Sequence, residues 1–462
     1  MRRAVQLAAV SALSLLTLRA SADCPSTAGD CQALLETGPT GGRVDFVIVG
    51  DGYTAAERDK FYADAAAVAA DLESASTYAS YAPVFNVWAL FVPSAESGAD
   101  DPATSTMVET AFDATYGFQG IDYLIGINTG AVFAEINERL PERDLAICLV
   151  NAGKYGGSGG PVAVTSTHPD SLRILEHEMG HSFAGLADEY ETPYPGYPPG
   201  DFEPNVALLE NLDPLKWSAW VTPGTPIPTS IGMATSDYDP VGAYEGARYL
   251  SAGVFRPSPS CRMRELGFDF CPVCAEAVVL GFSELRYLVD DVTPAEGTVV
   301  PASGTTVLSA VVPALSDLSV SWSVDGVIVE GAVTSELAFD PTALGLADGP
   351  HAITVTVSDD TPLVRTSVDG LMTATFTRNL VVDSTLPPVD GEGGAGGASS
   401  AGNGSGGAGS DDGDREEGHA GCSCRIGGAA AARGNPLLAL LALLALGRRR
   451  RSRSAAGASP PR

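Results

Sequence analysis

Residues 177–190 read His-Glu-Met-Gly-His-Ser-Phe-Ala-Gly-Leu-Ala-Asp-Glu-Tyr, and the predictions for the whole chain start from this stretch. On a helix, the imidazoles of His177 and His181 lie about 40° apart around the axis and one turn apart along it. Both can therefore bind one metal ion from the same side. The carboxylate of Glu178 can then reach a water molecule on that ion, which is the arrangement that zinc-dependent hydrolysis of a peptide bond requires.

The surrounding sequence predicts the helix that this argument needs. Asp170 is the predicted N-cap, and Gly185 is the predicted stop because glycine tolerates the left-handed conformation that ends helices. Between them, apolar side chains recur at spacings of three and four residues: Leu172, Leu175, Met179 and Phe183. One face of the helix is therefore apolar, and the two histidines flank it.

A catalytic zinc ion takes three protein ligands and keeps one position for water. The chain has five histidines, and the three outside the motif are poorly placed: His168, His351 and His419. A carboxylate is therefore the expected third ligand. Asp188 is favoured because its short side chain follows the predicted turn closely, and Glu189 and Glu245 are the alternatives.

Glu178 is the expected general base. It would take a proton from the zinc-bound water and later pass that proton to the leaving amine. Zinc lowers the pKa of such a water to about 7, so hydroxide is available at neutral pH.

The motif resembles the signature of the IgA-peptidase family of zinc metallopeptidases. Further stretches agree with it, at residues 44–53, 85–88, 155–160 and 271–274, and the resemblance covers roughly residues 40–288. It implies a zinc endopeptidase of metzincin-like character, with one catalytic Zn²⁺. It also implies that His177, His181 and Asp188 are the ligands and that Glu178 is the catalytic acid and base.

The sequence departs from the usual metzincin pattern in one respect. That pattern places a glycine seven residues after the first histidine and the third ligand ten residues after it. Ala184 and Ala187 stand there, and Gly185 and Asp188 each come one residue later.

Metzincins also place a methionine beneath the metal. Met263 is the candidate for this Met-turn, with Met233 as the alternative. Three tyrosines are candidates for stabilising the oxyanion of the tetrahedral intermediate: Tyr190, Tyr244 and Tyr249.

Both ends of the chain carry targeting patterns. Residues 1–22 combine a basic start, an apolar run and an Ala-Ser-Ala cleavage site, which predicts a signal peptide and export. Residues 384–421 are rich in Gly and Ser and predict a disordered linker. Residues 422–462 contain Cys422-Ser423-Cys424, an apolar segment and an Arg cluster, and this order resembles the MYXO-CTERM sorting tails.

That resemblance implies that a sorting protease removes the tail and that the protein stays at the cell surface or outer membrane. Membrane contact would occur only through the tail, and secretion is the alternative location. The parallel is with other C-terminal signals in which the hydrophobic segment marks processing.

The net charge of −30 argues against nucleic-acid partners, because an acidic surface repels phosphates. Eight cysteines in an exported chain predict disulfides. Cys24 and Cys31 can pair locally. A further cluster comprises Cys261, Cys271 and Cys274. A structural zinc would need a fourth ligand there, so a disulfide to a distant partner such as Cys148 is predicted instead.

Strands and helices alternate in the first part of the chain. Residues 44–49, 85–92 and 145–150 predict strands, whereas 54–74 and 131–139 predict helices. This pattern predicts an α/β metzincin-like peptidase domain with a mixed sheet over residues 23–288. Within it, residues 155–167 are predicted to form an edge strand along which a peptide substrate could add, and a simple hairpin is the alternative.

After residue 288 the pattern changes to short β-rich runs separated by turns such as Asp325-Gly326. With Trp322 on a central strand, the pattern predicts an immunoglobulin-like β-sandwich over residues 289–383. A spacer or binding role is expected for it.

The sequence therefore predicts an exported zinc endopeptidase that acts on a protein or peptide substrate. A non-catalytic adhesion protein with a degenerate peptidase domain is one alternative, and a zinc amidase acting on cell-wall peptide is the other. The intact His177, Glu178 and His181 favour the enzyme over the adhesion protein.

Overall fold

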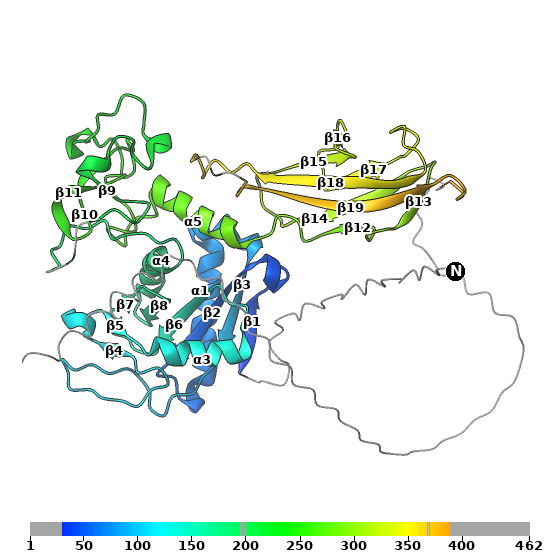
Figure 1. Cartoon of the computed structure of the whole chain (residues 1–462). Helices are drawn as coiled ribbons and strands as arrows, with labels where there is room; N and C mark the ends of the chain where they lie inside the picture. The colour runs from blue at the N-terminus through cyan, green and yellow to red at the C-terminus, as the bar shows by residue number, and fades with distance from the viewer. Residues whose placement is uncertain (1–29, 195–196, 198–199, 367, 369, 389–462) are drawn as a thin grey trace, which may run out of the picture. The chain divides into compact units, whose positions relative to one another are not determined.

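A six-stranded mixed sheet forms the centre of the first part of the chain, in a computed structural model that describes residues 30–194, 197, 200–366, 368 and 370–388 (Figure 1). The strand order is β1-β3-β2-β6-β8-β7. The strands are β1 (Cys31–Leu35), β2 (Val44–Asp51), β3 (Phe85–Leu90), β6 (Leu145–Val150), β7 (Gly157–Ser158) and β8 (Val162–Ser166). The four inner strands run parallel, and β1 and β7 pair antiparallel at the two edges.

Helices cover both faces of this sheet. They are α1 (Arg58–Ser74), α2 (Ser76–Ala79), α3 (Thr129–Arg139), α4 (Ser171–Ser182) and α5 (Pro272–Leu285). Along β2, Phe46 and Ile48 join the buried cluster that contains residues of α1, α4 and α5, whereas Val47 and Val49 join the cluster that contains residues of α3. Alternate side chains of a strand point to opposite faces, so the sheet lies between two layers of helix. The predicted mixed α/β class is confirmed.

The local signals that predicted these elements account for their boundaries. Thr54 and Glu57 form a capping box, which opens a short 3₁₀ turn ahead of α1, where the sequence predicts a helix to begin. Residues 155–167 differ from the prediction: they form the hairpin β7–β8, in which only β7 lies at the sheet edge. Gly159 and Gly160, which lie between β7 and β8, explain why this stretch breaks into two strands.

The segment between α4 and α5 is mostly irregular. It contains the three-stranded sheet β10-β11-β9, with bounds β9 (Ala207–Leu208), β10 (Tyr244–Ala247) and β11 (Leu250–Arg256). A separate two-stranded sheet comprises β4 (Thr115–Tyr116) and β5 (Ile125–Gly126).

Two sheets share one buried cluster in the residues after 288. One has the order β12-β14-β17 and the other β13-β19-β18-β15-β16. Their strands are β12 (Asp291–Thr293), β13 (Val299–Pro301), β14 (Thr306–Val311), β15 (Leu318–Val324), β16 (Val327–Ile328), β17 (Glu336–Phe339), β18 (Gly349–Asp359) and β19 (Thr373–Asp383). Trp322 is buried on β15, which pairs with β16 and β18. This arrangement is compatible with the predicted β-sandwich, and its immunoglobulin-like topology stays a prediction.

Several predictions fall outside the described residues. They concern the signal peptide, Cys24, most of the linker, and the tail with Cys422 and Cys424. Among the described residues, no helix is both long enough and apolar enough to cross a membrane.

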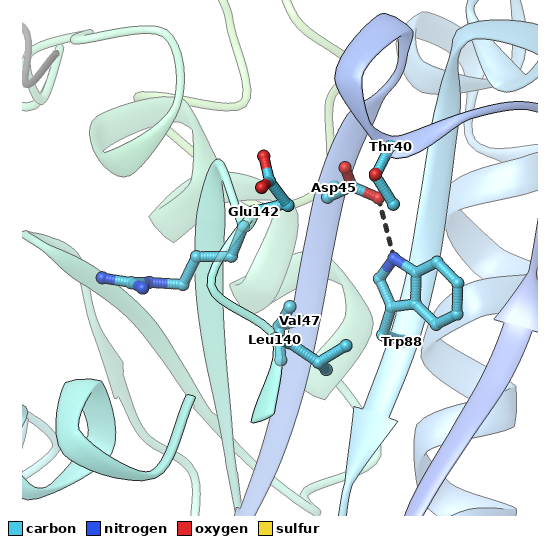
Figure 2. Close-up of a pocket in the computed structure, with 7 residues that line it drawn as sticks. Thr40, Asp45, Val47, Trp88, Leu140 and Glu142 are labelled. Atoms are coloured by element: carbon cyan, nitrogen blue, oxygen red, sulfur yellow. Dashed lines mark hydrogen bonds between the residues drawn. The ribbon is translucent and has the colours of Figure 1, made fainter. Parts of the chain in front are cut away.

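A buried carboxylate lies at the start of β2. Asp45 is 1% exposed and lines a pocket with Trp88 and Glu142 (Figure 2). Its Oδ1 accepts hydrogen bonds from Trp88 Nε1 at 2.8 Å and from Asn86 Nδ2 at 2.9 Å, whereas its Oδ2 has no partner among the described residues. Burial raises the pKa of Asp45 to about 6, although both hydrogen bonds oppose the shift.

This pKa makes stability depend on pH in a defined direction. An unfolded aspartate has a pKa of about 4, so the folded state binds the proton more tightly. The contribution of Asp45 to the free energy of unfolding should therefore be greatest below about pH 4 and should fall as the pH rises through 6. Asp45→Asn keeps an acceptor for both donors but carries no charge. It should flatten this fall and raise the free energy of unfolding at pH 8 by about 1–3 kcal/mol.

Urea unfolding at pH 4.5 and pH 8 measures both effects. Asp59→Asn, at an exposed position of α1, is the control and should keep the wild-type pH dependence. Equal pH dependence in Asp45→Asn and the wild type would contradict the prediction.

Candidate metal centre

Helix α4 carries the predicted motif. It begins after Asp170, as the sequence predicts, although the Asp170 side chain makes no capping hydrogen bond. Gly185 follows its end in the left-handed conformation, with φ of +63°. Leu175 and Met179 pack into the buried cluster on one face of the large sheet. This packing leaves His177 and His181 partly exposed beside the apolar face.

Backbone carbonyls orient both imidazoles. His177 Nδ1 lies 3.0 Å from the carbonyl oxygen of Arg262, and His181 Nδ1 lies 2.7 Å from that of Leu186. A carbonyl oxygen can only accept a hydrogen bond, so each Nδ1 must carry the proton. In a neutral imidazole the lone pair is then on Nε2. The two Nε2 atoms are 3.2 Å apart.

The Asp188 carboxylate completes a triangle with these two nitrogens. Its Oδ1 lies 3.1 Å from His177 Nε2 and 3.3 Å from His181 Nε2. This oxygen is buried and has no hydrogen-bond partner among the described residues. A tetrahedral zinc ion with bonds of about 2.0–2.1 Å would separate its ligand atoms by about 3.3–3.4 Å. The three side chains therefore fit such an ion.

The charges of these groups depend strongly on one another. Burial favours a neutral carboxyl, yet His181 and His177 outweigh it and hold the pKa of Asp188 well below its usual range. Burial would lower the pKa of His181, but Asp188 raises it to about 9. The pKa of Glu178, which is 8% exposed, is raised by burial. A divalent cation would compete with the protons on the imidazoles for the same electron pairs.

One of the three candidate tyrosines contacts Asp188 directly. The hydroxyl of Tyr249 donates to Asp188 Oδ2, and the backbone N–H of Arg248 donates to the Asp188 carbonyl at 2.9 Å. Arg248 and Tyr249 form the turn between β10 and β11, with φ of +49° and +65°. Left-handed conformations cost free energy in residues other than glycine, and they often occur at functional sites.

The other two tyrosines lie differently. The ring of Tyr190 is nearly parallel to that of His177, with centroids 6.5 Å apart, and meets the Tyr249 ring edge-on at 5.3 Å. Tyr244 is buried, and its hydroxyl donates to the Pro240 carbonyl at 2.8 Å. The structure therefore brings Tyr190 and Tyr249 to the site and turns the hydroxyl of Tyr244 elsewhere.

Met263 lies under α4. Its side chain is fully buried. It belongs to a turn in which the backbone N–H of Arg264 donates to the Cys261 carbonyl at 2.9 Å. A Cβ atom on Gly180 would stand only 2.6 Å from the Met263 sulfur, so the absence of a side chain at position 180 permits this contact. Met233, the alternative, is 40% exposed.

The two alternative third ligands point away from the histidines. Glu189 Oε1 accepts from Asn205 Nδ2 at 2.9 Å and from Cys274 Sγ at 3.2 Å. Glu245 is exposed and accepts from the backbone N–H of Gly253 at 2.9 Å. Of Asp188, Glu189 and Glu245, only Asp188 lies beside both imidazoles.

The predicted disulfides at Cys148 and in the later cysteine cluster are not formed. Cys148, Cys261, Cys271 and Cys274 are free, buried thiols, whereas Cys31 is disulfide-bonded. Cys148 belongs to the core on β6 and is absent from the cluster that the other three form with Glu189. Glu189 and Asn205 were not predicted to lie at this cluster. The only available signal was that Asp188 and Glu189 are two adjacent carboxylates, and the first site uses just one.

Comparisons with known proteins place the first part of the chain in a family. Among solved structures, the SGBP-B protein of the Bacteroides ovatus mixed-linkage glucan utilization locus, in complex with a mixed-linkage heptasaccharide, is 16% identical over 22% of this chain and 26% of its own, with a TM-score of 0.15. The endo-β-1,4-mannanase from Thermotoga petrophila is 12% identical over 74% of this chain and 65% of its own, with a TM-score of 0.16. Both chains are matched over less than two thirds of their length, and neither likeness carries an argument.

Curated proteins give no match to this chain. The model of the IgA Peptidase M64 family, in contrast, matches residues 32–235, which include α4 and Asp188. The family resemblance predicted from the sequence is thereby confirmed, and this part of the chain belongs to the IgA Peptidase M64 family of peptidases.

Proposed function

We propose that the protein is an exported, zinc-dependent endopeptidase in which His177, His181 and Asp188 bind the catalytic metal ion. The observation that carries this proposal is the triangle formed by the two Nε2 atoms and Asp188 Oδ1, with sides of 3.1–3.3 Å. Both histidines are held by carbonyls in the tautomer that a metal needs. Membership in a peptidase family supports the same reaction.

When bound, zinc would supply a Lewis acid that polarises the scissile carbonyl and lowers the pKa of water to about 7. Glu178 is next to His177 on α4 and is almost fully buried. Its carboxylate takes the proton from the attacking water and then delivers it to the nitrogen of the leaving amine. Tyr190, whose ring lies over His177, is the candidate donor to the oxyanion.

The sheet edge beside α4 suggests how a substrate binds. Gly159 follows β7, and a Cβ atom there would lie 2.7 Å from His181 Cβ and 3.1 Å from Glu178 Oε2. The backbone at residues 158–160 therefore passes directly beside these two side chains. Leu124 already pairs with Gly157 on the outer side of β7, so an extended peptide would add beside residues 158–160, where it would place a peptide bond near Glu178.

The other parts of the proposal rest on sequence patterns. Residues 1–22 would direct export, and residues 422–462 would direct sorting to the cell surface. The disulfide at Cys31 supports an oxidising compartment, because cytosolic proteins rarely contain one. An amidase acting on cell-wall peptide would use the same residues, and digestion of purified peptidoglycan alongside casein separates the two substrates.

Glu178→Gln tests the catalytic role. The variant should keep its bound metal, because Glu178 is not a proposed ligand, and should lose about 10²–10⁴-fold in turnover, the usual contribution of a general base. Metal analysis and casein cleavage, with and without a chelator, measure the two properties.

Glu245→Gln is the matched control. Among the described residues, this exposed carboxylate accepts a hydrogen bond only from the backbone N–H of Gly253, so its variant should behave as the wild type. Wild-type turnover in Glu178→Gln, or activity that survives complete chelation, would overturn the proposal.

Tyr249→Phe tests whether Tyr249 positions Asp188. The change removes the hydrogen bond to Asp188 Oδ2 and should weaken zinc affinity about 10–100-fold, the usual cost of losing such support for a ligand. Activity should recover when zinc is in excess. Tyr244→Phe is the control, since its hydroxyl contacts Pro240.

Zinc titration of the apoenzyme and kcat at saturating zinc distinguish the two roles. Unchanged affinity combined with a kcat that stays low at saturating zinc would mean that Tyr249 acts on the substrate and not on the metal ligand.

A further inference from the structure

A second cluster of metal-ligand side chains lies close to the first. Glu189, Cys261, Cys271 and Cys274 each offer one ligand atom, and all four atoms lie within 4.8 Å of one another. All four residues are completely buried. Glu189 directly follows Asp188, Cys261 opens the turn that contains Met263, and Cys271 and Cys274 lie at the N-terminus of α5.

The cluster leaves polar groups unsatisfied inside the protein. Glu189 Oε2 is buried and has no hydrogen-bond partner among the described residues. In the described ranges, its other oxygen accepts only from Asn205 Nδ2 and from the thiol of Cys274, which is a weak donor. Burying a carboxylate with an unpaired oxygen costs several kcal/mol unless a cation compensates the charge or the group takes up a proton. No side-chain cation is bonded to either Glu189 oxygen in the described part of the chain.

One thiol sulfur, that of Cys261, accepts a hydrogen bond from the backbone, and two others lie at a helix N-terminus. The backbone N–H of Cys271 donates to Cys261 Sγ at 3.2 Å, and the N-terminus of α5 favours negative charge on Cys271 and Cys274. Three sulfurs and a carboxylate oxygen thus face one another within 4.8 Å, and Cys274 Sγ donates to Glu189 Oε1 at 3.2 Å. Mutual approach of such groups is favourable when they surround a positive ion.

We propose that Glu189, Cys261, Cys271 and Cys274 bind a second, structural metal ion. This ion is zinc, because three thiolates are soft ligands of the kind that zinc prefers. In a tetrahedral site, bonds of about 2.3 Å to sulfur and about 2.0–2.2 Å to oxygen separate the ligand atoms by about 3.4–3.8 Å. The four ligand atoms lie within 4.8 Å of one another, so small side-chain shifts would bring the wider pairs to these separations. Four protein ligands leave no position for water, so the ion is structural.

The second ion would tie together the segments that shape the first site. The backbone N–H of Glu189 donates to the Met263 carbonyl at 2.8 Å, and the carbonyl of Arg262, between Cys261 and Met263, holds His177. Asn205 Nδ2 contacts both Glu189 Oε1 and the Ala187 carbonyl, so it orients Glu189 in the way that supporting residues orient metal ligands. The ion would fix the position of Asp188 through Glu189. Only this consequence depends on the proposed function.

Metal content and cobalt spectroscopy of the full-length protein, purified with a reductant, test the inference. The wild type should contain two zinc ions per chain. After replacement by cobalt it should show a near-ultraviolet thiolate-to-cobalt charge-transfer band, which nitrogen and oxygen ligands do not give. Cys274→Ala should lose one ion and most of the band.

Two further variants separate the sites. His177→Ala should also lose one ion but keep the full thiolate band. Cys148→Ala removes a buried thiol outside the cluster and should keep both ions and the band. A thiolate band without peptidase activity would leave the second site standing and refute the proposed function.

The inference would be overturned by a wild-type protein that holds one ion and shows no thiolate band. Mass-spectrometric mapping of a disulfide between any two of Cys261, Cys271 and Cys274 would also overturn it. Both measurements use the unmodified chain, so they decide the question even if the Cys274→Ala variant fails to fold.

Discussion

The hydrogen bonds between two imidazole Nδ1 atoms and two backbone carbonyls determine the chemistry of the first site. They place both protons on Nδ1 and leave both lone pairs on Nε2. The carbonyls come from Leu186, just after the helix, and from Arg262, far along the chain. A helix with correctly spaced histidines is therefore not sufficient: the His177 ring acquires its orientation only when the turn at 261–264 packs beneath α4.

Three short irregular segments meet around these rings. The chain after α4 brings Asp188, the turn between β10 and β11 brings Tyr249, and the turn at 261–264 brings Arg262 and Met263. Each is held to another by a backbone hydrogen bond, such as Arg248 N to the Asp188 carbonyl and Glu189 N to the Met263 carbonyl. The regular sheet supports α4, but these turns supply the remaining geometry.

Patterns that are local in sequence were predictable. Helix α4, the strands β2 and β6, the capping box before α1 and the choice of Asp188 all follow from residue spacing or from turn chemistry within a few residues. The choice among the three tyrosines could not be predicted, because the turn between β10 and β11 decides which hydroxyl reaches Asp188. The hydrogen bond between Cys274 and Glu189 joins residues 85 positions apart, and no spacing rule in the sequence predicts it.

The contact between Gly180 and the Met263 sulfur has a mechanical consequence for α4. Rotating the helix by one residue, about 100°, would bring a neighbouring side chain into a space that admits only hydrogen. The glycine therefore fixes the rotation of α4 about its own axis relative to the turn at 261–264. One of the two unspecified positions in a His-Glu-x-x-His pattern is thus constrained sterically from outside the helix, even though it never touches a metal or a substrate.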